Sequence, residues 1–251
     1  AGGGGTIQSG DVQWMTAGAG VVHEEFHSPD FAKNGGVFEM VQLWVNLPAK
    51  DKMTAPKYQA ILKQDIPVLE FADQAGHLRV IAGEYAGQHG PASTFSPVNV
   101  WDGVLKAGHA ELMHVPVDHN VLLVLLEGEL LLNGVQKVAD SSIVMFAQDG
   151  DPALQLEAAQ DAKFLLLTGK ALNEPIQGYV PFVMNTKDEI IQAFVGRGKD
   201  VIFTAFPFFM PFVDIDDFLS DTHYGVHVVG IDERGHVVFT SDVLYQFVDN
   251  E

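Results

Sequence analysis

His23 and Glu25 are the side chains in this sequence with the clearest potential for metal chemistry. Because the sequence contains no cysteine, a metal bound here takes nitrogen and oxygen ligands, which suit iron, nickel, manganese or copper. On a strand, residues two apart point to the same side, so His23 and Glu25 would face one cavity while Glu24 faces away. A His-x-Glu sequence by itself is seldom a metal site, so the interpretation depends on the surrounding sequence.

A second group of candidate ligands follows a glycine in the middle of the chain. His109, Glu111 and His114 imitate a metal-binding motif in the sequence GHAELMH. Leucine and proline residues surround them, so we expect turn or surface positions. The sequence also lacks the Gly-x-Ser-x-Gly pattern of a serine hydrolase, and no hydrolase is indicated.

Composition narrows the classes of function. The chain has 251 residues, with 33 acidic against 14 basic side chains and a formal charge of −19. Such a charge repels a phosphate backbone, so we expect no direct contact with nucleic acid. No uncharged apolar run is long enough for a membrane span, and the N-terminus is glycine-rich, so we expect a cytoplasmic protein.

The elements that must position these side chains are short strands. Many brief apolar runs, interrupted by 25 glycines and 12 prolines, predict an all-β protein of the barrel or jelly-roll type. The clearest runs predict strands at Val37–Leu47, Val68–Glu70, Leu78–Gly83, Val98–Asp102 and Ala162–Gly169. In the first of these, Val37, Val41, Leu43, Val45 and Leu47 share one face, which we expect in the core.

Turn and cap signals add two local predictions. Asn133-Gly134 breaks an apolar run and favours a tight type I′ turn between two strands. Thr186 and Glu189 have the spacing of a capping box, which predicts a short helix near residues 186–195. Residues 66–169 therefore carry the signals of one complete jelly roll.

Three collinear motifs resemble the pirin family of two-domain cupin proteins. They are the sequences from Gly10 to Glu25, from Gln42 to Met53 and from Gly178 to Phe194. The resemblance implies two cupin-type jelly-roll domains. On this reading residues 1–56 are part of the N-terminal cupin domain, and residues 57–200 are the C-terminal cupin domain with its closing helix.

The resemblance also implies a site. In pirins the first motif supplies a His and a Glu ligand, which match His23 and Glu25, and two more His ligands come from an HPHxGxE stretch that this sequence lacks. The implied activity is that of a quercetin 2,3-dioxygenase, which acts on a flavonol-type aromatic substrate. The implied cofactor is a divalent metal, with iron as the first choice. Glu25 would also be the catalytic base, and Trp14 and Met15 would shape the substrate pocket. The alternative is a non-catalytic pirin-like binding or regulatory protein that has lost part of its metal site and acts on a protein partner.

The tail, residues 201–251, permits three interpretations: a circularly permuted N-terminal segment, an unrelated extension or a diverged sequence. Its FP, PF and acidic segments look like the opening of a pirin. If the tail is permuted, Val237–Phe247 should pair antiparallel with the first barrel. The tail's own candidate ligands, which would then approach His23, are His223, His227, Glu233 and His236.

Overall fold

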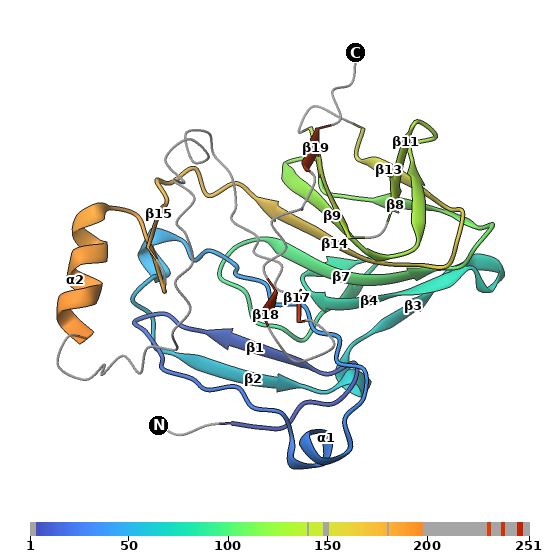
Figure 1. The fold of residues 1–251 in the computed structure, drawn as a ribbon. Helices are drawn as coiled ribbons and strands as arrows, with labels where there is room; N and C mark the ends of the chain where they lie inside the picture. Colours follow the sequence, from blue (N-terminus) through green and yellow to red (C-terminus); the bar gives the residue numbers. More distant parts are fainter. Residues whose placement is uncertain are drawn as a thin grey trace.

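The computed structural model describes residues 4–139, 141–147, 151–179 and 181–197, together with three short strands further along the chain. Strands dominate these ranges, which confirms the all-β prediction (Figure 1). Within them no helix combines the length and the apolar character that a membrane span requires. The candidate ligands in the tail lie outside the described residues.

The centre of the molecule is a jelly roll made of two sheets. The larger sheet has the order β19-β12-β9-β14-β7-β4-β3, and the smaller sheet has the order β11-β10-β13-β8. The larger sheet is built from β3 (Val68–Glu70), β4 (Gly76–Ala82), β7 (Val98–Leu105), β9 (His119–Glu127), β12 (Ser142–Phe146), β14 (Ala162–Lys170) and β19 (Tyr245–Phe247). The smaller sheet is built from β8 (Ala110–His114), β10 (Glu129–Leu132), β11 (Gln136–Ala139) and β13 (Ala153–Ala158).

Alternate side chains of β14 lie in two different hydrophobic clusters, one on each face of the larger sheet. Phe164 and Leu166 point between the two sheets and are fully buried, whereas Leu165 and Leu167 belong to a second cluster on the outer face. Successive side chains of a strand point to opposite faces, so a strand that is apolar on both faces must be covered on both. The strand predicted at Ala162–Gly169 is confirmed, and it lies centrally, between β9 and β7.

Glycines form the turns where the sequence predicts them. Asn133 and Gly134 join β10 to β11 with φ values of 50° and 69°, the left-handed conformations of a type I′ turn. At Gly128, where the chain leaves one sheet for the other, φ is 89° and a Cβ would lie 2.1 Å from the Asp161 carbonyl oxygen. Only glycine fits that corner.

The N-terminal segment covers the outer face of the larger sheet. Its strands β1 (Val12–Thr16) and β2 (Lys57–Ile61) pair antiparallel in a separate two-stranded sheet (Figure 1). Val12, Trp14 and Ile61 join the outer-face cluster with the leucines of β14. The segment also has helix α1 (Pro29–Asn34) and one 3-10 turn, η1 (Ala49–Asp51); two more, η2 (Lys63–Asp65) and η3 (Ala72–Gln74), flank β3.

The strand predicted at Val37–Leu47 is absent from the described N-terminal segment, so that prediction is wrong. Only Val41 and Leu43 pack against the outer-face cluster, while Val37 is 92% exposed and Val45 is 41% exposed. A strand must pair its backbone N–H and C=O groups with a neighbour. Among the described residues no strand lies alongside this run, and the apolar pattern alone cannot supply one.

The third motif, Gly178 to Phe194, forms two short strands and a helix near the second motif, Gln42 to Met53. Strands β15 (Gln177–Tyr179) and β16 (Phe182–Met184) precede helix α2 (Lys187–Arg197). The predicted capping box is confirmed, because the Thr186 N–H donates to Glu189 Oε2 at 2.8 Å and the Glu189 N–H donates to Thr186 Oγ1 at 3.2 Å. Glu174 accepts from the Ala49 N–H at 2.6 Å, which ties this segment to the N-terminal part.

The described strands of the tail do not pair as a permuted N-terminal half should. β17 (Gly230–Ile231) pairs with β18 (Val237–Val238), and β19 runs parallel to β12 at the edge of the jelly roll. The expected antiparallel pairing of Val237–Phe247 with the first barrel is therefore not seen in these strands. A short hairpin, β5 (Glu84–Tyr85) with β6 (Gln88–His89), completes the fold.

Candidate metal site and its anchors

The segment that carries the two predicted ligands begins at a carboxylate anchor. Asp11 Oδ1 accepts from the Lys63 N–H at 2.8 Å, and Asp11 Oδ2 accepts from the Gln8 N–H at 2.9 Å. These two hydrogen bonds lower the pKa of Asp11. The aspartate of the GDVQWM motif thus fixes the entry to β1 rather than taking part in chemistry.

Trp14 and Gly18 then hold β1 and the following turn. The Trp14 indole Nε1 donates to the Ser93 carbonyl oxygen at 2.8 Å, so Trp14 contacts the loop between β6 and β7. The expectation that Trp14 lines a substrate pocket beside His23 has no support in these contacts. At Gly18, φ is 49° and a Cβ would lie 2.2 Å from the Thr54 carbonyl oxygen, which instead accepts from the Ala19 N–H at 2.8 Å.

Replacing Trp14 with phenylalanine is expected to destabilise the protein by about 1 kcal/mol, because an aromatic ring is kept while the pyrrole N–H and its hydrogen bond to Ser93 are lost. Chemical denaturation of the variant measures the loss. Gln13→Ala, an exposed neighbour on the same strand, should change the free energy of unfolding by less than about 0.5 kcal/mol. Equal effects of the two substitutions would contradict the anchoring role of Trp14.

His23 and Glu25 come together beyond this turn. The His23 Nδ1 and Glu25 Oε1 atoms lie 3.8 Å apart, and the two side chains are 45% and 51% exposed. The residues here belong to no strand, so the strand geometry expected for this pair is not formed. Both donors nevertheless face the same space, at a separation that one metal ion could bridge.

The described residues supply only part of a metal site. No cluster of three or more His, Asp or Glu side chains that could hold a metal occurs in the described part of the chain. His27 lies two residues beyond Glu25 and was not among the predicted ligands. Its ring stacks on Phe31, with the two ring centroids 5.1 Å apart. The donor types of His23 and Glu25 therefore fit a metal of the iron class, but the number of donors does not complete a centre.

The second candidate motif does not converge. Glu111 lies half-buried on β8, and His114, three residues later, is exposed. Residues an odd number apart on a strand face opposite sides, so the Glu111 carboxylate and the His114 imidazole point apart. Burial raises the pKa of Glu111. The expected surface location is found for His114, whereas Glu111 is partly enclosed.

Family comparisons agree with the motifs in the sequence. The family described as "Pirin" matches residues 1–45, and the family described as "Pirin C-terminal cupin domain" matches residues 100–196. A protein of Pseudomonas aeruginosa, provisionally named a quercetin 2,3-dioxygenase, is 50% identical over 192 residues, which are 76% of this chain and 66% of that protein. A pirin-like protein of Solanum lycopersicum is 38% identical over 193 residues, covering 76% of this chain and 64% of its own length.

A solved structure extends the similarity to three dimensions. The crystal structure of a quercetin 2,3-dioxygenase from Acinetobacter baumannii is 56% identical, with a TM-score of 0.76 over 79% of this chain and 69% of that one. A second crystal structure, of a Geobacillus kaustophilus protein, is 31% identical with a TM-score of 0.58 and covers 66% of this chain and 65% of that one. The chain spans slightly less than two thirds of the length of the two curated relatives described above.

Proposed function

The chain belongs to the pirin family of two-domain cupin proteins, and from that premise we propose that it is a metal-dependent dioxygenase acting on a flavonol-type aromatic substrate. The observation that carries the proposal is the approach of the His23 imidazole to the Glu25 carboxylate, 3.8 Å apart, in the motif shared with the family. Relatives named as quercetin 2,3-dioxygenases support the choice of substrate class.

The two residues would share the work in the following way. His23 and Glu25 would hold a divalent metal, iron first, with nickel, manganese or copper as alternatives. The metal would supply Lewis acidity toward a substrate hydroxyl. The Glu25 carboxylate, half exposed and pointing at the same space as His23, can accept the proton of that hydroxyl. The anchors at Asp11, Trp14 and Gly18 would fix the position of this pair.

An oxygen-uptake assay tests the proposed activity. The purified chain is incubated in air with Fe(II) or Ni(II) and quercetin, and oxygen consumption is followed beside the loss of flavonol absorbance. We expect the dissolved oxygen and the flavonol absorbance to fall together, and we expect both decreases to require added metal. The matched variants His23→Gln and His109→Gln separate the site from general metal effects, since only the first should stop the reaction.

A non-catalytic binding protein is the second candidate, and the open site favours it. Two half-exposed ligands hold a divalent ion weakly, and no third donor lies beside them among the described residues. In that case metal would bind at His23 and Glu25 without oxygen uptake in the presence of quercetin. Metal binding with no flavonol consumption would therefore replace the dioxygenase by this second function.

A further inference from the structure

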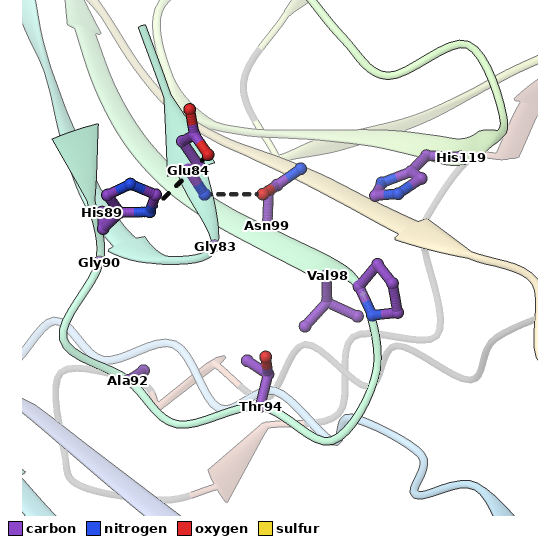
Figure 2. A pocket seen from close by; sticks show the side chains of 10 residues that line it. Gly83, Glu84, His89, Gly90, Ala92, Thr94, Val98, Asn99 and His119 are labelled. Atoms are coloured by element: carbon purple, nitrogen blue, oxygen red, sulfur yellow. Dashed lines mark hydrogen bonds and ion pairs between the residues drawn. The ribbon is translucent and has the colours of Figure 1, made fainter. Parts of the chain in front are cut away.

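A cavity of about 380 Å³ lies at one end of the larger sheet, and its lining residues belong to none of the three family motifs. It opens where β4 ends and where β7 and β9 begin, and Figure 2 shows its lining side chains. Asn99 and His119 stand on one side of the space, and Glu84 and His89 stand on the other. The position brings polar groups from four separate elements to one opening.

A chain of hydrogen bonds fixes the buried wall. The Glu84 N–H donates to Asn99 Oδ1 at 3.0 Å, so the Asn99 amide nitrogen must face Thr168, to whose Oγ1 it donates at 2.7 Å. Thr168 Oγ1 then lies 2.9 Å from His119 Nδ1. Asn99, His119 and Thr168 are 7%, 9% and 4% exposed. A buried polar chain of this kind leaves each member one orientation.

These hydrogen bonds determine which ring nitrogen of His119 carries the proton. Thr168 Oγ1 accepts from Asn99, and this buried hydroxyl has no acceptor other than His119 Nδ1 among the described residues, so it donates its proton there and the imidazole proton sits on Nε2. Burial lowers the pKa of His119, which keeps the ring neutral near pH 7. No hydrogen bond from Nε2 to another described residue is formed. His119, which lines the cavity, therefore carries a fixed N–H donor.

The opposite wall has complementary chemistry. Glu84 Oε2 lies 3.7 Å from His89 Nδ1, on the β5–β6 hairpin, and both side chains are more than half exposed. Gly83 and Gly90 bring backbone close between the walls, since a Cβ at Gly83 would lie 2.0 Å from Asn99 Oδ1 and one at Gly90 would lie 2.5 Å from the Ile81 backbone. The wall offers a carboxylate acceptor across from the His119 donor.

The N-terminal sheet holds the floor of the cavity. Gln59 Nε2 donates to the Pro91 carbonyl oxygen at 3.2 Å, and Gln59 Oε1 accepts from the Ser93 N–H at 2.9 Å. With the bond from Trp14 and one from Lys57 Nζ to Ser93 Oγ at 3.2 Å, four hydrogen bonds tie the loop that carries Ala92 and Thr94 to the β1–β2 sheet. The cavity is thus formed in advance by both parts of the chain, as small-molecule sites usually are.

We propose that this cavity binds a small uncharged polyhydroxylated compound, such as a monosaccharide or a cyclic polyol. A hydroxyl group accepts from His119 Nε2 and donates to the Glu84 carboxylate, and a compound with several hydroxyls can satisfy both walls together. The formal charge of −19 and the Glu84 carboxylate disfavour an anion. Among the described residues that line the cavity there is no Phe, Tyr or Trp on which a flat aromatic ligand would stack.

Nuclear magnetic resonance of protein labelled with ¹⁵N in histidine tests the site, with D-glucose, myo-inositol, catechol and malonate as probes. We expect the Nε2–H tautomer at His119 in the free protein, and a shift of its signals with glucose or inositol. The Thr168→Val variant, which removes the hydroxyl but keeps the shape, should bind at least about tenfold more weakly. His109→Gln lies outside the cavity and should bind like the parent.

Each other outcome overturns the proposal. A shift with catechol alone or malonate alone would replace the ligand class, and no shift with any probe would remove the site. A free protein with the proton on Nδ1 would contradict the hydrogen-bond chain itself, without reference to any ligand. None of these readouts depends on metal or on flavonol turnover, so the cavity and the dioxygenase proposal can fail separately.

The lowered pKa of His119 also predicts a pH dependence of stability. In the unfolded chain His119 takes up a proton as the pH falls below its usual pKa of about 6.5, whereas in the folded protein burial opposes this protonation. The stability of the folded protein therefore falls as the pH decreases below that value. Asp118 opposes and Lys170 reinforces this effect, and Glu84 and His89 face the ring across the cavity. Denaturation at pH 7.5 and 5.5 should show a larger loss for the parent than for His119→Gln. An equal loss in both would contradict the assignment.

Discussion

Truncation of Phe164 to alanine is expected to destabilise the protein by about 3–5 kcal/mol. The ring is fully buried between the two sheets of the jelly roll, and it lies over Gly103 of the neighbouring strand, where a Cβ would come within 2.2 Å of the ring. Removing the ring leaves a cavity that a glycine cannot fill. Equilibrium denaturation by urea measures the change in the free energy of unfolding.

Phe26→Ala is the matched control for this truncation. Phe26 is 83% exposed, so removal of the same ring should change the free energy of unfolding by less than about 0.5 kcal/mol. A small effect at Phe164, comparable to that at Phe26, would show that the two sheets do not enclose the core described here.

Replacement of Glu25 by glutamine is expected to lower the rate of flavonol consumption by about 10²–10⁴-fold. The amide keeps the size of the carboxylate but accepts no proton and carries no charge for a divalent metal. Steady-state rates with saturating metal and quercetin measure the effect. The expectation rests on the proposed dioxygenase function.

Glu24→Gln is the control for this second substitution, because it makes the same chemical change one residue away. No ion pair links Glu24 to another described residue, whereas Glu25 lies 3.8 Å from His23. We expect the rate of the Glu24 variant to stay within about twofold of the parent, since surface substitutions outside a site are close to neutral. Equal losses in the two variants would remove Glu25 from the role of base.

Local signals in the sequence predicted much of the second domain. Asn133-Gly134 forms the type I′ turn, and the Thr186–Glu189 capping box begins α2, because each depends on a few adjacent residues. These two features need no information about distant parts of the chain. The apolar run at Ala162–Gly169 became β14 because β7 and β9 supply partners on both sides.

The wrong prediction in the N-terminal segment has a long-range cause. The run at Val37–Leu47 has the apolar alternation of a strand. A strand forms only beside another strand, however, and which strands become neighbours depends on the tertiary structure. The same limit applies to β2, which none of the predicted strands covers but which pairs with β1. Apolar periodicity reports which faces could be buried and not which neighbours will bury them.

The site was predictable in part for a similar reason. His23 and Glu25 are close in sequence, and their meeting followed from the motif. The anchoring of Trp14 by Ser93 joins residues 79 positions apart, and the cavity beside His119 collects side chains from the ends of several strands. No local pattern marks contacts of this kind.

Metal content tests the central claim, that His23 and Glu25 together hold a divalent ion, most directly. The parent protein, Glu25→Gln and Glu24→Gln are dialysed against the same Fe(II) or Ni(II) solution, and bound metal per chain is measured by elemental analysis. We expect the parent and Glu24→Gln to bind the ion and Glu25→Gln to lose it. Retention of the same amount by Glu25→Gln would contradict the claim.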